Sequence, residues 1–428
     1  MQLYLHSDPE KWREILARPA QDLAQLEAPV NAILQEVATR GDDALLDLTA
    51  KFDGVRLAEL AVSKEEIELA AEQLPADLRI AIQTAKENIA QFHAAQQETP
   101  QVIETMPGVR CWRKSVGIER VGLYIPGGTA PLFSTVLMLA VPAQLAGCKE
   151  IVLCTPPQKD GTVHPAILYA AQLAGVERIF RVGGAQAIAA MAYGTESIPA
   201  TYKIFGPGNA YVTVAKQLVS RLGVAIDMPA GPSEVMVVAD DTADPDFVAA
   251  DLLSQAEHGT DSQVVLVTYS EAMARRIMQA TEQQLASLPR REFAAASLAN
   301  SSALVVATTS EAIALINAYA PEHLILSVEQ PENLAAGVIN AGSVFMGHYT
   351  PESVGDYASG TNHTLPTNGF ARAYSGVSLD AFVKKITYQQ LSKEGLQNIG
   401  PTVETMATAE SLVAHQRAVS IRLAKINS

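Results

Sequence analysis

Residues 321–363, PEHLILSVEQPENLAAGVINAGSVFMGHYTPESVGDYASGTNH, combine two apolar runs with four side chains capable of acid–base or metal chemistry. The runs, at 322–328 and 342–347, are typical of buried strands, and we expect a short helix between them. The four side chains are those of Glu322, His323, Asp356 and His363. An acid and an imidazole at the mouth of a buried strand lie where α/β enzymes keep catalytic groups. An isolated Glu-His pair is also compatible with a helix cap beside a core histidine, so other parts of the chain must decide.

Strands and helices alternate along most of the remaining chain. A first set of strands, separated by helices near 164–175, 185–193 and 210–221, is expected at 150–154, 177–182 and 202–206. A second set is expected at 234–239, 263–267, 303–308, 323–328 and 343–347. This alternation is typical of parallel sheets with right-handed crossovers. The first hundred residues have mostly helical apolar spacing, and a helix over about 402–425 suggests an appended helical unit.

The composition is that of an ordinary globular protein. The 428 residues, 48% hydrophobic and 18% charged, suffice for roughly two to four domains. The 46 acidic and 31 basic residues give a formal charge of -15, which disfavours nucleic acid and anionic membrane surfaces as partners. The N-terminus has no signal-peptide or transit-peptide pattern. Three cysteines form neither an even disulfide framework nor a CxxC pair, and we therefore expect a cytoplasmic, reducing location.

One uncharged run, residues 125–148, is long enough to span a bilayer. It contains the helix breakers Pro126, Pro131 and Pro142, together with several polar residues. The run therefore predicts a loop followed by a buried helix and not a membrane span.

Three glycine-rich turns lead from strands or loops into predicted helices, at 124–135, 181–187 and 205–211. Glycine in such turns lets backbone N–H groups approach an anionic ligand at a helix N-terminus. None of the turns is GxGxxG, so the usual dinucleotide fingerprint is absent. A single turn of this kind is more often structural, but three in one α/β lobe favour a phosphate-bearing cofactor.

Potential metal ligands are scattered along the chain. Gln255 and His258 are three residues apart on a helix predicted over 246–258 and would share a face. Glutamine is an uncommon zinc ligand, so this pair alone is weak evidence. Asp356 could add a carboxylate oxygen and His415 an imidazole nitrogen, although the spacing does not show that they meet.

Six motifs, in order along the chain, together resemble the histidinol dehydrogenase family. They are GLYIPGG (122–128), FGPGNAYV (205–212), IDMPAGPSE (226–234), AEHGTDSQ (256–263), APEHL (320–324) and GDYASGTNHTLPT (355–367). The resemblance covers essentially the whole chain, and no motif departs from the family at the positions that matter. It implies two successive NAD-dependent oxidations, of L-histidinol to L-histidinal and then to L-histidine, at the end of histidine biosynthesis.

The resemblance also implies roles for individual residues. Glu322 and His323 match the two proton acceptors, and Tyr124, Gln186 and Asn209 match NAD-binding positions. The implied zinc ligands are Gln255, His258, Asp356 and His415, with His415 expected from the other subunit of a homodimer. The implied substrate-binding residues are Ser233, Gln255, His258, His323, Asp356, His363, Glu410 and His415.

The implied fold is α/β, with two incomplete Rossmann-like domains similar to those of aldehyde dehydrogenases and small helical additions at both ends. We expect an N-terminal helical arm over 1–20 and a C-terminal helical unit over 378–428 that contributes to the partner's site. The first α/β domain, with most metal and catalytic residues, is expected over 21–123 and 235–377. The second, on the NAD side, is expected over 124–234.

The chemistry fits these residue types. Alcohol oxidation needs a base near the hydroxyl as hydride leaves carbon, and His323 suits that step. The aldehyde must first be hydrated, and a partly desolvated Glu322 suits activation of that water. Zinc would position the imidazole and amine nitrogens of histidinol, with a Lewis-acid role as the lesser possibility.

Three alternatives remain open at this point. An aldehyde-dehydrogenase mechanism would use a cysteine thiolate, although Cys111, Cys148 and Cys154 do not lie in turns beside a base. A metal-dependent lyase or hydrolase would not use NAD. A non-enzymatic binding protein would give the acid–base residues between 322 and 363 no purpose.

Overall fold

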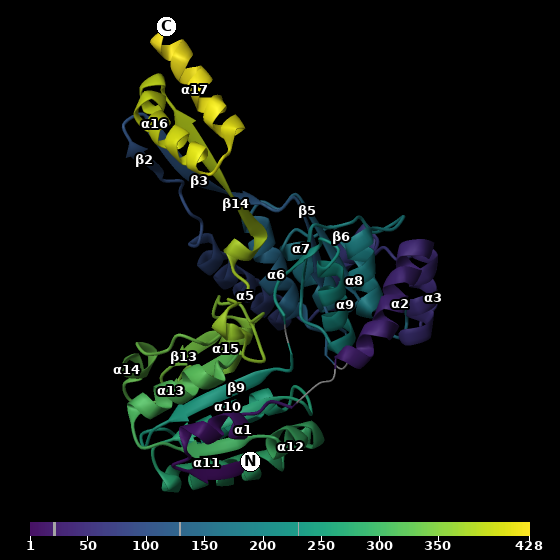
Figure 1. Cartoon of the computed structure of the whole chain (residues 1–428). Coiled ribbons are helices and arrows are strands. Elements are labelled where there is room, and N and C mark those ends of the chain that lie inside the picture. Colours follow the sequence, from purple (N-terminus) through teal and green to yellow (C-terminus); the bar gives the residue numbers. More distant parts are fainter. Residues whose placement is uncertain (20–22, 128–129, 230) are drawn as a thin grey trace.

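A computed structural model describes residues 1–19, 23–127, 130–229 and 231–428. Two parallel α/β layers form the body of the molecule, and a smaller unit carrying the C-terminus projects from it (Figure 1). The predicted boundary at residues 20–21, Gly128 of the first glycine turn and Ala230 of the IDMPAGPSE motif lie outside the described residues.

The first layer is a six-stranded, all-parallel sheet in the order β1-β11-β10-β9-β12-β13. Its strands are β1 (Gln2–Leu5), β9 (Glu234–Ala239), β10 (Gln263–Thr268), β11 (Ser302–Val305), β12 (His323–Ser327) and β13 (Ser343–Met346). The central strands β9 and β12 are buried on both faces, as their continuous apolar runs predict. Val235 and Val237 of β9 face one core, whereas Met236 and Val238 face the other.

Helices cover both faces of this sheet. One face packs against α10 (Pro245–Ala256), α11 (Glu271–Leu285) and α12 (Arg291–Ala299). The other packs against α1 (Trp12–Ile15), α13 (Thr309–Tyr319) and α14 (Pro331–Ala335). The short helix α15 (Glu352–Tyr357) follows β13. The short 3₁₀ turns are Pro9–Lys11, Ala70–Gln73, Phe370–Arg372 and Leu379–Phe382.

The second layer is a five-stranded parallel sheet in the order β6-β5-β4-β7-β8. Its strands are β4 (Arg120–Tyr124), β5 (Glu150–Thr155), β6 (Arg178–Arg181), β7 (Lys203–Phe205) and β8 (Ala225–Ile226). One face packs against α4 (Lys64–Leu69), α5 (Ala76–Ala94), α6 (Phe133–Leu145) and α7 (Pro165–Leu173). The other packs against α2 (Ala24–Arg40), α3 (Asp42–Phe52), α8 (Gly184–Tyr193) and α9 (Ala210–Ser220).

The packing of α2–α5 differs from the expected domain boundaries. Residues 21–123 were grouped with 235–377, but helices α2–α5 pack on the five-stranded sheet (Figure 1). The sequence of an amphipathic helix indicates that one of its faces is buried. It does not indicate which sheet covers that face. The N-terminal arm is also not purely helical, because β1 forms the edge of the six-stranded sheet beside β11.

The projecting unit contains an antiparallel sheet as well as helices. Strand β14 (Val383–Leu391) pairs with β3 (Val109–Gly117), which also pairs with β2 (Val102–Met106). The helix expected over about 402–425 is two helices, α16 (Lys393–Ala409) and α17 (Val413–Asn427). They separate at Ser411, whose φ of 60° is left-handed and cannot continue an α-helix.

The α/β fold class and the expected strands of both parallel sheets are confirmed. The described residues of the uncharged run at 125–148 form a loop and the buried helix α6, as predicted. Within the described ranges, no helix combines the length and the apolar character needed to cross a bilayer.

Candidate active site

Glu322 and His323 lie at the amino end of β12, an interior strand of the six-stranded sheet between β9 and the edge strand β13. His323 is in register with Val235 of β9 on one side and Ser343 of β13 on the other. Both side chains are buried, with exposed fractions of 5% for Glu322 and 4% for His323. The pair therefore lies at the amino ends of the parallel strands. Ligand sites of α/β proteins more commonly lie at the carboxyl ends.

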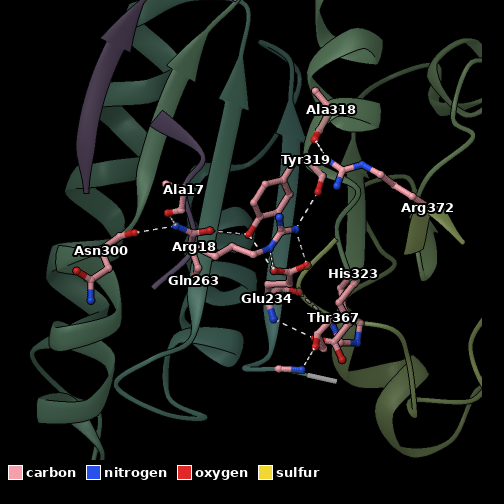
Figure 2. Close-up of polar contacts among 12 residues, drawn as sticks. Ala17, Arg18, Glu234, Gln263, Asn300, Ala318, Tyr319, His323, Thr367 and Arg372 are labelled. Carbon is pink, nitrogen blue, oxygen red and sulfur yellow. Dashed lines mark hydrogen bonds and ion pairs between the residues drawn. The ribbon is translucent and has the colours of Figure 1, made fainter. Parts of the chain in front are cut away.

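The backbone of Glu234, at the start of β9, holds both side chains. Its N–H donates to Oε2 of Glu322 at 2.9 Å, and its carbonyl oxygen lies 3.3 Å from Nδ1 of His323 (Figure 2). A carbonyl oxygen can only accept, so Nδ1 carries the proton of this hydrogen bond. Among the described residues, Nε2 of His323 has no hydrogen-bond partner. In the neutral ring, Nε2 is thus left as a proton acceptor.

Burial and neighbouring charges shift the pKa of both groups. Burial raises the pKa of Glu322 to about 8, and the nearby His323 opposes this shift. For His323, burial acts to lower the pKa, but the carboxylates of Glu352, Glu322 and Asp356 outweigh it and raise the pKa to about 10. A cation bound by Asp356 would act in the opposite direction on the imidazole.

Carboxylates surround His323 at short range. Nδ1 is 3.7 Å from Oε2 of Glu322 and 3.8 Å from Oε1 of Glu352, and Nε2 is 3.6 Å from Oδ1 of Asp356. Glu352 is 1% exposed, and its Oε2 has no hydrogen-bond partner within the described chain. The sequence reasoning missed Glu352, although its i, i+4 spacing to Asp356 on α15 could have revealed it.

Potential metal ligands gather beside this pair. His258, Glu352 and Asp356 each offer a ligand atom, and these atoms lie within 4.8 Å of one another. Gln255, at the end of α10, is fully buried, and neither of its amide atoms has a partner among the described residues. Unpaired buried amide atoms are costly without a ligand. Nitrogen, amide and carboxylate donors in this arrangement fit a divalent cation such as zinc.

The imidazole of His258 is suited to metal binding. It follows the end of α10, one side reaches solvent, and its enclosed position lowers the pKa although Asp356 opposes the shift. A lowered pKa keeps the ring neutral near pH 7, which is the form that binds metals.

His363 links the two sheets at the site. Its Nδ1 lies 2.8 Å from the backbone oxygen of Asp356, and its Nε2 lies 3.1 Å from Oγ1 of Thr135 on α6. Ser233 immediately precedes β9, and its carbonyl oxygen accepts from the N–H of Gln263 at 3.3 Å. Ser233 thus adjoins Glu234 along the chain, and His363 contacts the backbone of Asp356.

Glu410 and His415 do not join this cluster within one chain. They belong to the projecting unit, which Figure 1 shows on the opposite side of the body from α10 and β9. If they act at a site of this kind, a second copy of the chain must supply them.

Tyr124, Gln186 and Asn209 line a single cavity of about 870 Å³ on the five-stranded sheet. Tyr124 ends β4, and its hydroxyl accepts from the N–H of Gly184 at 3.1 Å. Asn209 caps α9, its Oδ1 accepting from the N–H of Val212 at 3.1 Å. A Cβ on Gly206 would lie 2.0 Å from the Tyr124 carbonyl oxygen, so only glycine lets these two strand ends approach.

The cysteines are unsuited to thiolate catalysis. Burial raises the pKa of Cys148 to about 11 and also raises that of the fully buried Cys154. Cys111 lies on β3 of the projecting unit. All three thiols are free.

Known proteins of one family are similar to this chain along nearly its whole length. The family model for histidinol dehydrogenase matches residues 16–423. A histidinol dehydrogenase of Bacteroides thetaiotaomicron is 60% identical over 423 residues, which are 99% of each chain. One of Escherichia coli is 53% identical over 417 residues, 97% of this chain and 95% of that one. The crystal structure of histidinol dehydrogenase from Elizabethkingia anophelis superposes with a TM-score of 0.98, at 54% identity, covering 100% of this chain and 99% of that one. The chain therefore belongs to the histidinol dehydrogenase family of enzymes.

Proposed function

We propose that the protein oxidises L-histidinol to L-histidinal and then to L-histidine, and that NAD accepts one hydride in each step. Membership of the family gives the histidinol oxidation of histidine biosynthesis. The observation that carries the finer proposal is the buried Glu322–His323 pair held by the Glu234 backbone beside an unpaired amide and two carboxylates.

In the first step, His323 is the base. Its Nδ1 is bound to the Glu234 carbonyl oxygen, so the Nε2 lone pair faces the space beside Asp356. The hydroxyl proton of histidinol moves to Nε2 as hydride leaves the carbon for NAD. One hydride, which carries two electrons, and one proton leave the substrate, and the aldehyde remains.

In the second step, Glu322 is the base. Water adds to the aldehyde carbon, and Glu322 takes a proton from that water. The resulting gem-diol anion loses a second hydride to NAD and becomes the carboxylic acid, which releases a further proton to give the carboxylate. A carboxyl group whose pKa is raised to about 8 by burial is a stronger proton acceptor than an exposed one.

Gln255, His258 and Asp356, completed by His415 from a second copy of the chain, would hold zinc. The unpaired amide of Gln255 and the lowered pKa of His258 support this set. Bound zinc would supply a positive centre that fixes the imidazole and amine nitrogens of the substrate. Ser233, His363 and, from the second copy, Glu410 would complete the contacts to histidinol.

The cavity at Tyr124, Gln186 and Asn209 is the proposed NAD site. In the order β6-β5-β4-β7-β8, the chain passes from β4 to one side and returns to β7 on the other. Ligands of open parallel sheets bind at such a reversal, outside the carboxyl ends of the strands. Tyr124 ends β4 and Asn209 follows β7, so both residues flank the reversal.

A homodimer is proposed because the C-terminal unit is incomplete alone. Helix α17 has no buried residue within one chain. The unit also exposes large apolar side chains, including those of Met406, Leu412, Val413 and Ile421. Exposed apolar surface of this extent marks an interface. The three free thiols are consistent with a cytoplasmic location.

The test is NADH production from L-histidinol by the purified protein, before and after chelation. Two NADH per histidinol consumed, lost on chelation and restored by zinc, are expected. A yield of one NADH would restrict the activity to the alcohol step. No NADH from zinc-loaded protein would reject the proposal.

A further inference from the structure

The side chain of Glu234 takes part in a buried network on the opposite face of the six-stranded sheet from His323. Arg18 forms a two-pronged ion pair with it, Nε to Oε2 and Nη2 to Oε1, the latter at 2.8 Å (Figure 2). The hydroxyl of Tyr319 is 3.4 Å from Oε2. Glu234 itself is 2% exposed. One residue therefore touches the catalytic pair through its backbone and this network through its carboxylate.

Arg18 is held in place from several directions. Its Nη2 also donates to the Tyr319 carbonyl oxygen at 2.8 Å, and its guanidinium lies 4.0 Å from the centre of the Tyr319 ring. The Tyr319 hydroxyl donates to Oε1 of Gln263 at 2.9 Å, and Nε2 of Gln263 donates to the Ala17 carbonyl oxygen at 2.9 Å. The N-terminal segment is thereby fixed against the starts of β9 and β10.

Sheet formation does not require this pair. Strand β9 already hydrogen-bonds to β10 on one side and β12 on the other. A buried ion pair loses hydration energy that its attraction often fails to recover, so apolar residues would stabilise the same position as well or better. A two-pronged Arg–carboxylate contact additionally fixes the orientation and separation of the guanidinium and the carboxylate.

We propose that Arg18, Glu234 and Tyr319 form a positioning network that sets the orientation of the two proton acceptors, Glu322 and His323. The network fixes the Glu234 peptide groups, whose N–H holds the Glu322 carboxyl and whose carbonyl oxygen holds Nδ1 of His323. This inference rests on the proposed function for its effect on turnover. Its structural part, control of the orientation of the His323 ring through the hydrogen bond at Nδ1, does not.

Loss of the network has a defined consequence. If the Glu234 carbonyl oxygen moves away, Nδ1 loses its acceptor and nothing holds the ring in the orientation that directs Nε2 toward the space beside Asp356. A displacement of about 1 Å suffices to reduce turnover substantially, on the order of 100-fold.

The central experiment compares Glu234→Gln with Glu66→Gln in the zinc-loaded enzyme. Glu66 forms an ion pair with the mostly buried Arg181 at the five-stranded sheet, and it lies outside the NAD cavity. Both changes remove one carboxylate from a long-range Arg–Glu pair. We expect kcat to fall about 10- to 100-fold for Glu234→Gln, with KM for NAD and zinc content unchanged, and to stay near wild type for Glu66→Gln.

A second variant separates positioning from stability. The double substitution Arg18→Met/Glu234→Met replaces the buried pair by apolar side chains and should keep the melting temperature. We expect its kcat to be as low as that of Glu234→Gln. Arg18→Lys keeps the charge without the two-pronged contact and should have an intermediate kcat.

A readout independent of turnover is the ¹⁵N spectrum of histidine-labelled protein. The chain has 8 histidines, and His323→Gln assigns the His323 signals. We expect a hydrogen-bonded Nδ1–H signal of His323 in the wild type and a shift or loss of this signal in Glu234→Gln. If the His323 signals and kcat of Glu234→Gln match those of Glu66→Gln, the network is only structural and the inference is wrong. If the signals change but the wild type makes no NADH, the positioning stands and the proposed function fails.

Discussion

The raised pKa of Glu322 predicts how the second oxidation depends on pH. Below a pKa of about 8, most Glu322 is protonated and cannot accept a proton from water. We therefore expect the oxidation of L-histidinal to increase with pH through about 8. The measurement is kcat/KM for histidinal against pH in the wild type and in Glu322→Gln.

Glu322→Gln should remove this ascending limb and lower histidinal oxidation by roughly 100- to 10,000-fold, the usual contribution of a positioned base. Oxidation of histidinol to the aldehyde should be affected less, because His323 is the proposed base of that step. An ascending limb unchanged in Glu322→Gln would assign it to another group.

His323→Gln should slow the oxidation of histidinol more than the oxidation of histidinal. The variant loses the acceptor at Nε2, so we expect the first NADH of a single turnover to form roughly 100- to 10,000-fold more slowly. Rapid mixing with histidinol, followed at the NADH absorbance, measures this step. A first step at the wild-type rate would exclude His323 as its base.

At the residue scale, the sequence named several side chains that lie close together. These are Glu322, His323, Asp356 and His258, although the spacing alone could not show that they meet. Two further residues, Glu352 and Glu234, were not predicted. Glu234 is invisible as a site residue because it acts through its backbone, which every residue shares.

Among the structural elements, the 3₁₀ turn before β14 anchors the projecting unit to the body. Phe382 is fully buried and stacks on Phe205 of β7, with ring centres 4.1 Å apart. Its carbonyl oxygen accepts from the N–H of Ile118 at 2.9 Å. We expect Phe382→Ala to lower the free energy of unfolding by about 3–5 kcal/mol, measured by denaturant titration.

Tyr388→Ala is the matched control for this change. Tyr388 also belongs to a stacked pair, with Trp112 at 5.4 Å, but it is 37% exposed. Its removal should cost distinctly less. Equal losses for the two variants would mean that Phe382 is no special anchor.

Helix α5 carries a buried histidine that makes the fold sensitive to acid. Nδ1 of His93 donates to the Ile89 carbonyl oxygen at 2.9 Å, whereas Nε2 has no partner in the described part of the chain. Burial lowers the pKa of His93 below its usual 6.5, and the bond to Ile89 only partly opposes this. Below about pH 6.5 the unfolded chain therefore binds a proton that the native state does not, and stability decreases as pH falls.

His93→Leu should weaken this dependence. We expect a smaller loss of unfolding free energy between about pH 7.5 and 5.5 than in the wild type, measured by urea titration at each pH. The same loss in both proteins would assign the acid sensitivity to other groups.

The elements differed in how readily their sequences could be interpreted. Strands such as β9 and β12 are buried on both faces and have long apolar runs that predict them directly. Strand β2 is exposed along its whole length and β14 along most of it, so neither has the apolar pattern of a buried strand. Strand β1 is too short for its alternation to be distinctive.

For the whole molecule, the separation of His415 from His323 predicts complementation between subunits. His323→Ala and His415→Ala should each be nearly inactive alone. When they are mixed, half of the dimers should be mixed ones with one intact site of two, giving about a quarter of wild-type activity. Denaturation and joint refolding, followed by an NADH assay, measures this.

The matched control is His348→Ala mixed with His323→Ala. His348 follows β13 and contacts Ser327 and Thr242, away from the proposed ligands. This mixture also contains one intact site per mixed dimer, and His348→Ala should be active alone. No activity from the His323→Ala and His415→Ala mixture would contradict a shared site.

The placement of whole domains was the least predictable feature. The alternation of strands and helices predicted two parallel layers, and the family resemblance agreed. The side of the molecule on which α2–α5 pack depends on contacts with residues far along the chain, such as those of α2 with α9, which contribute Leu34 and Val212 to one core. Local sequence does not contain that information.

The parallel pairing of β1 with β11 determines when each half of the molecule can be completed during synthesis. Gln2 pairs with Ser302, so β1 is synthesised about 300 residues before its partner strand, roughly 15–60 s at ordinary elongation rates. Helices α2–α5 and the five-stranded sheet, which end near residue 226, can fold during that interval. The half with the proposed cofactor cavity can thus form before the half with Glu322 and His323, which is completed only when β11 pairs with β1.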